Sequence, residues 1–124
     1  MKSKLIFAVV SCISLNAIST HANAAFWIEN DTKNSLSFAI KNTCSSEFGT
    51  IKPHDHNLIS EDKFFSVCKN NPHHCIAKIY TGDACSGKHT ATMVLDTDFG
   101  FKSVTKAGPY TYTSNINNLI ISEK

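Results

Sequence analysis

Apolar and polar residues alternate in short runs over most of the chain after residue 24. In one such run Leu36, Phe38 and Ile40 alternate with smaller or polar residues, which places three apolar side chains on one face of a strand. Glycine, proline and paired asparagines separate the runs, as turns require. The predicted strands are residues 26–28, 36–40, 57–60, 75–80, 90–95, 101–105, 110–114 and 119–122. The pattern predicts an all-β fold, a small antiparallel β-sandwich with Greek-key connections.

Residues 60–68 do not follow this alternation of apolar and polar residues. Ser60 can cap a helix that carries acidic residues in its first turn, and Phe64 and Cys68 would then share one helical face. The segment therefore predicts one short helix near residues 61–68. A strand through Phe64 and Phe65 is the alternative.

The first 24 residues have the three parts of a secretory signal peptide. Lys2 and Lys4 precede an apolar run at residues 5–13, and the segment ends in Ala22-Asn23-Ala24. A membrane-spanning helix needs about 20 apolar residues, so this run is too short to span. We therefore expect residues 25–124 to be the mature protein, a single β-sandwich domain without an integral membrane segment. Its location would be secreted or periplasmic.

Four cysteines follow the expected cleavage point, and an even number in an exported chain predicts two disulfides. Cys75 and Cys85 lie at opposite ends of a predicted strand, about 16 Å apart at roughly 3.3 Å per residue. Bridged Cα atoms lie only about 4.4–6.8 Å apart. The pairing of Cys68 with Cys75 and of Cys44 with Cys85 is therefore favoured, in a disulfide-linked sandwich.

Charge argues against a nucleic-acid partner. Without Lys2 and Lys4 the 12 basic residues become 10, equal to the 10 acidic ones, so the mature chain is neutral when histidine is neutral. The chain contains no arginine, the residue on which bidentate phosphate recognition depends.

Residues 77–87 combine an aromatic, Tyr80, with a second anchor at Cys85 and a glycine at Gly87. This spacing resembles the folded hairpin of βγ-crystallin-type Greek keys. The resemblance implies a glycine in a conformation that other residues avoid, and two side chains packed across the hairpin. Cys85 stands where that family has its second aromatic, so a disulfide would replace ring packing. Calcium binding of the family type is not expected, because Lys102 stands where the family has a hydroxyl.

Histidines provide the main candidate chemistry. His54 and His56 alternate along an extended segment, a spacing that can hold zinc or copper. His73 and His74 lie between two cysteines and could add a ligand if the loops meet. The competing interpretation is that both pairs are solvated loop residues beside prolines.

Two further kinds of site have weaker support in the sequence. Asp96-Thr97-Asp98 resembles the opening of a calcium loop but has no third acid or closing glutamate, and such residues commonly form a turn. A hydrolase could combine His54 and Asp55 with a serine, although no G-x-S-x-G motif marks an activated one.

The aromatic residues should mostly fill the core. Phe99 and Phe101 flank Gly100 in a turn, where alternation cannot bury both, so they are candidates for contact with a protein or glycan partner. The sequence therefore predicts a non-catalytic, exported binding or interaction protein without a cofactor. The alternatives are an extracytoplasmic zinc- or copper-binding protein and a small secreted hydrolase. Residues 119–121 are the candidate for an open sheet edge that a partner strand could extend, although the default expectation is that this last strand is packed.

Overall fold

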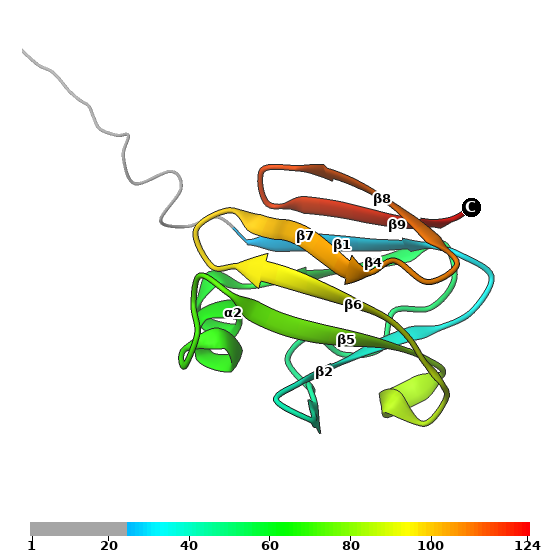
Figure 1. Ribbon diagram of the computed structural model, residues 1–124, viewed down its shortest axis with the longest axis horizontal. Coiled ribbons are helices and arrows are strands. Elements are labelled where there is room, and N and C mark those ends of the chain that lie inside the picture. Colours follow the sequence, from blue (N-terminus) through cyan, green and yellow to red (C-terminus); the bar gives the residue numbers. More distant parts are fainter. Residues whose placement is uncertain (1–24) are drawn as a thin grey trace, which may run out of the picture.

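The alternating runs form strands in two β-sheets that pack face to face (Figure 1). The computed structural model describes residues 25–124, and the predicted signal peptide lies outside the described residues. None of the helices in this part of the chain has the length and apolar character needed to cross a bilayer. The predicted small, disulfide-linked β-sandwich is confirmed.

The first sheet has four strands. Its two central strands bury apolar residues at alternate positions, whereas the two outer ones bury only Ile59 and Tyr110. In order across the sheet the four strands are β4 (Asp55–Ile59), β1 (Phe26–Asp31), β9 (Asn118–Glu123) and β8 (Tyr110–Asn115). The second sheet has five strands. In order they are β3 (Thr43–Cys44), β2 (Leu36–Ile40), β5 (Cys75–Thr81), β6 (His89–Asp96) and β7 (Gly100–Lys106).

The position of β9 confirms the default expectation of a packed last strand and corrects the expectation of a purely antiparallel sandwich. β9 is not an open edge, because it lies between β1 and β8 and hydrogen-bonds to both. Its pairing with β1 is parallel, with Ile28 opposite Leu119, so the first sheet is not purely antiparallel. A parallel pair joins strands that are not consecutive, and here it joins the first strand to the last.

Helix α2 (Glu61–Cys68) forms at the predicted position. Ser60 accepts a hydrogen bond from the backbone N–H of Lys63 at 3.3 Å, as an N-cap side chain should. Phe64 and Cys68 are buried on one face of the helix. The predicted helix is therefore confirmed, and β4 ends at Ile59 because Ser60 caps α2 instead of extending the strand.

Aromatic rings fill the end of the core beneath α2. The rings of Phe26 and Phe64 stack with centroids 5.0 Å apart, and Phe48 contacts both of them edge-on at 6.4 and 5.9 Å. Phe48 is fully buried although it lies in the loop between β3 and β4. The loop and α2 therefore share one aromatic cluster at that end of the sandwich.

Two disulfides connect elements that the backbone ladder does not join. Cys44 on β3 is bonded to Cys85 in the 3₁₀ turn η2 (Asp83–Cys85), and Cys68 at the end of α2 is bonded to Cys75 at the start of β5. This is the pairing that the strand geometry favours. Gly87 is needed after η2, because a Cβ there would collide with the carbonyl oxygen of Thr81.

Candidate functional sites

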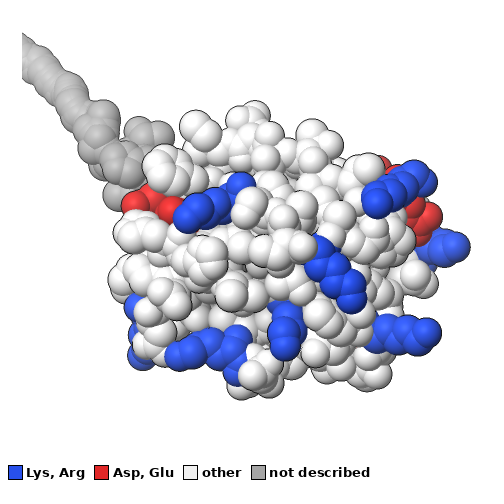
Figure 2. Space-filling model, viewed as in Figure 1, with Lys and Arg blue, Asp and Glu red and all other residues white. Residues whose placement is uncertain are grey.

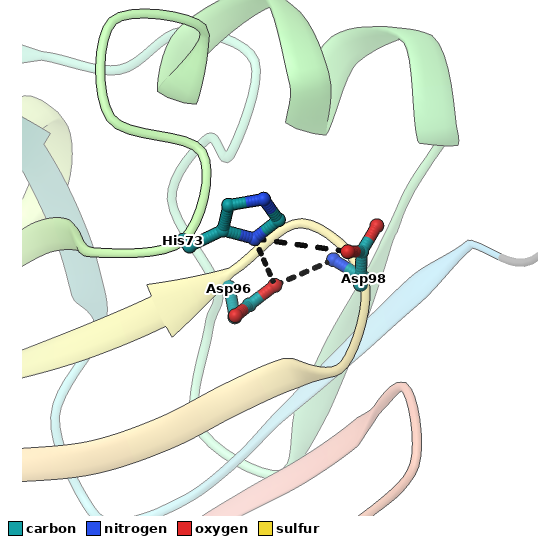
Figure 3. A group of neighbouring side chains, drawn as sticks. All are labelled: His73, Asp96 and Asp98. Carbon is teal, nitrogen blue, oxygen red and sulfur yellow. Dashed lines mark hydrogen bonds and ion pairs between the residues drawn. The ribbon is translucent and has the colours of Figure 1, made fainter.

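The β5–β6 hairpin brings His73 together with Asp96 and Asp98. The two strands pair with Cys75 opposite Leu95, so the loop just before β5, which carries His73, meets the end of β6 and the turn after it. His73 Nδ1 lies 3.2 Å from Asp96 Oδ1 and 3.7 Å from Asp98 Oδ2 (Figure 3). All three potential ligand atoms lie within 4.8 Å of one another. We call these three residues the His73 cluster.

Backbone contacts fix the His73 cluster in place. The backbone N–H of Asp98 donates to Asp96 Oδ1 at 2.8 Å, which orients the carboxylate. The N–H of Thr97 donates to the carbonyl of Pro72 at 2.8 Å, and Lys102 Nζ donates to the carbonyl of His73 at 2.8 Å. These contacts attach the loop before β5 to the β6–β7 turn, so the cluster does not depend on a single side-chain contact.

Asp96 is the charged anchor of the cluster and is only 6% exposed. Its burial raises the pKa of the carboxyl, but the N–H of Asp98, the hydrogen bond with His73 and the charges of His73 and Lys102 together outweigh burial. The net pKa therefore lies below the ordinary value of 3.8, and Asp96 is ionised at neutral pH.

The four histidines expected to share a metal do not converge. His54 adopts a left-handed backbone conformation with φ of 62°, so the segment is not extended there, and its Nδ1 lies 2.9 Å from Asp31 Oδ1. The ring of His56 stacks on Trp27 at 3.8 Å. Within residues 25–124, the only gathering of metal-type ligands involves His73 and neither His54 nor His56. His74 faces a separate pocket, described below.

The hydrolase arrangement is not formed as expected. His54 pairs with Asp31 and not with Asp55. In the described part of the chain, no serine hydroxyl hydrogen-bonds to a histidine ring. The segment that resembles the opening of a calcium loop forms a tight turn, in which Asp96 accepts from the backbone N–H of Asp98 and faces an imidazole.

The two aromatics of the β6–β7 turn have different environments. The side chain of Phe99 is 62% exposed, beside the exposed Ile116. Phe101 is partly buried and stacks on Tyr112 with ring centroids 5.8 Å apart. Of these two rings, therefore, Phe99 is the one available as an exposed contact.

A pocket that sequence reasoning missed lies between the end of α2, the β2–β3 turn and β5. Its cavity volume is about 240 Å³, and its apolar lining includes Ile40, Val67 and Ile76. We call it the α2–β5 pocket. The sequence signal was the placement of an apolar residue, Ile76, on the strand face that does not point into the core.

The rim of the α2–β5 pocket is cationic and amide-rich. Lys41, Lys78 and His74 line it, and no acidic residue does. Lys78 Nζ donates to Asn42 Oδ1 at 3.0 Å. Lys41 and Asn42 both have positive φ, 56° and 63°, in the two-residue turn between β2 and β3. Such turns favour asparagine and glycine, so the lysine holds a conformation that costs energy at the edge of the pocket.

No protein-family model and no curated protein sequence matches the chain. Among solved structures the chain is similar to NttC, a type II secretion system substrate of Legionella pneumophila, with a TM-score of 0.62 and 15% sequence identity. The match covers 82% of this chain and 98% of NttC. At this identity the likeness establishes a shared fold.

Proposed function

We propose that this chain is a non-catalytic binding protein that acts outside the cytoplasm and takes a small amphipathic anion into the α2–β5 pocket. Three features support export: the leader-like residues 1–24, the two disulfides, and a fold shared with a substrate of a type II secretion system. A secreted protein of that kind is the form we favour over a periplasmic one, because the fold likeness is to a secretion substrate.

The choice of an amphipathic anion rests on one observation: the pocket lining has an apolar part and a cationic part. An apolar floor of Ile40, Val67 and Ile76 would bury a short alkyl group, while Lys41 and Lys78 would bind an acidic head group. A volume of about 240 Å³ equals that of roughly eight water molecules at about 30 Å³ each, which suits a ligand of modest size.

The surface around the pocket favours an acidic ligand as well. Figure 2 shows lysines distributed over the face in front of β5, β6 and β7, with acidic residues only near its edges. Within residues 25–124, the single ion pair between a lysine and a carboxylate joins Lys52 and Asp83. Lys78 and Lys106 both lie in register with Thr92 on the second sheet, and neither pairs with a carboxylate of the described residues, so both can attract an anion although the mature chain as a whole is neutral.

Phe99 is the basis for a second proposed contact, with a larger partner. With Ile116 it presents two exposed apolar side chains at the end of the sandwich beyond β6. We assign this pair to contact with a protein or glycan partner, and not to the small-molecule pocket. Phe101, which packs against Tyr112, has no part in this surface.

Titration of the oxidised, ¹⁵N-labelled mature protein with octanoate tests the pocket. We expect saturable shifts of amide resonances at Val67, Ile76 and Lys78. Octanol, which keeps the alkyl chain and lacks the charge, should bind about tenfold more weakly, which corresponds to about 1.4 kcal/mol. Acetate should not bind, because it has no alkyl chain to bury.

A matched pair of variants separates the pocket from the rest of the surface. Ile76→Glu places a carboxylate at the pocket and should abolish octanoate binding. Leu58→Glu makes the same kind of change at an exposed apolar strand position on the other sheet and should leave binding intact. Shifts that fail to saturate, or that persist in Ile76→Glu, would contradict the proposal.

A further inference from the structure

We propose that the His73 cluster is a binding site for one divalent transition-metal ion of the zinc type, held by His73 Nδ1 and one carboxylate oxygen each of Asp96 and Asp98. This goes beyond the proposed anion pocket and does not depend on it, because none of the three residues lines that pocket. It also differs from the histidine set that the sequence indicates, since it includes two aspartates and omits His54, His56 and His74.

The spacing of the ligand atoms fits a tetrahedral ion. Four ligands placed tetrahedrally about 2.1 Å from an ion lie about 3.4 Å from one another. His73 Nδ1 lies 3.2 Å from the ligand oxygen of Asp96 and 3.7 Å from that of Asp98, on either side of this value. Asp98 is 65% exposed, so a small rotation of its side chain is sterically free to complete the contact.

The chemistry of the three ligands selects the class of ion. An imidazole nitrogen with carboxylate oxygens suits zinc and neighbouring divalent metals. Calcium takes about 6–8 oxygen ligands at about 2.3–2.6 Å, which the single turn between β6 and β7 does not supply. The side chain of His73 is 67% exposed, so water can occupy the fourth position.

The surroundings hold the ligands before an ion binds. The N–H of Asp98 already orients Asp96, and the Cys68–Cys75 disulfide closes the loop that carries His73. Outer contacts of this kind raise metal affinity because they reduce the ordering that binding requires. The charges also favour a cation, since two carboxylates face one ammonium, that of Lys102, whose Nζ contacts the His73 carbonyl.

Isothermal titration of the oxidised mature protein with Zn²⁺, with native mass spectrometry for stoichiometry, tests the site. We expect one ion per chain. His73→Gln and Asp98→Asn should each weaken binding by more than about tenfold. Both positions are more than half exposed, so these variants should keep the fold, and far-UV circular dichroism checks that they do. Co²⁺ in place of Zn²⁺ should give the intense visible absorption of tetrahedral coordination.

Two further variants distinguish this site from adventitious binding. His54→Gln removes an equally exposed histidine that also pairs with an aspartate, and it should leave Zn²⁺ affinity unchanged. Asp31→Asn removes the carboxylate that pairs with His54, and it should likewise leave Zn²⁺ affinity unchanged, in contrast to Asp98→Asn. No uptake of Zn²⁺, or equal affinity in the wild type and His73→Gln, would overturn the proposal.

Discussion

Removal of the Cys44–Cys85 disulfide, by the double substitution Cys44→Ala and Cys85→Ala, should destabilise the fold mainly through the unfolded chain. The bond connects β3 to the η2 turn across a sequence separation of 41 residues. Both cysteines are partly exposed, so alanine leaves little empty space in the core. The loss should therefore come from the conformational freedom that the unfolded chain regains.

The size of this loss follows from the length of the closed loop. The chain-entropy relation gives about 13 cal/mol/K for a loop of about 42 residues, or about 4 kcal/mol at 25 °C. The Cys68–Cys75 bond, with a separation of 7, closes a loop of about eight residues, for which the same relation gives only about 2.5 kcal/mol. Domains of this size have total stabilities of about 5–15 kcal/mol. Loss of the Cys44–Cys85 crosslink should therefore remove a large part of the free energy of unfolding.

Urea denaturation measures the effect. Trp27 is the single tryptophan and stacks on His56 between two strands of the first sheet, so its fluorescence reports global unfolding. The double variant should show a lower midpoint and a larger m value, because an unfolded chain without the crosslink exposes more surface. A free-energy loss below about 1 kcal/mol with an unchanged m value would refute this reasoning.

Two further predictions concern the last strand and the buried acid. Deletion of residues 119–124 removes the strand between β1 and β8 together with the buried Leu119 and Ile121, each worth about 1.5–3 kcal/mol. We expect no cooperative thermal transition, and a melting temperature equal to that of the full mature chain would contradict this. The lowered pKa of Asp96 stabilises the fold at pH values above its unfolded value near 3.8, and this contribution is lost as the pH falls further, through the folded pKa. Asp96→Asn should therefore be less stable at neutral pH and lose less stability on acidification, and parallel pH profiles of urea midpoints would contradict it.

The local elements could be predicted because their signals lie within a few residues. The serine at position 60 and the acids after it indicate a helix, and the structure places α2 there. Alternation at Leu36, Phe38 and Ile40 indicates a strand with one core face, and all three side chains are buried. Such patterns reflect backbone geometry, which needs no knowledge of the partner strand.

Long-range placement could not be predicted in the same way. The apolar residues 119–121 read equally well as an edge or a central strand, because the run does not specify its neighbours. The burial of Phe48 could not be predicted from the alternation of apolar and polar residues either. This residue lies in a loop, and its partners Phe26 and Phe64 come from distant segments.

The candidate sites could be predicted only in part, because local geometry and long-range pairing both decide which side chains meet. The metal prediction placed weight on His54, whose positive φ breaks the extended geometry that the spacing assumes. Sequence alone does contain a signal for the His73 cluster, because an antiparallel hairpin brings the loop before its first strand to the end of its second strand and the turn after it. Only the register of that hairpin shows that His73 meets Asp96 and Asp98.

The parallel pairing of β1 with β9 has a consequence for how this chain acquires its structure. During synthesis β1 emerges early and can pair with β4, but its other neighbour, β9, lies far later in the sequence, with Trp27 opposite Asn118. The first sheet therefore cannot be completed until β9 is available. Contacts of such long sequence separation slow folding, so we expect the β1–β9 pair to form late, after the hairpins of the second sheet.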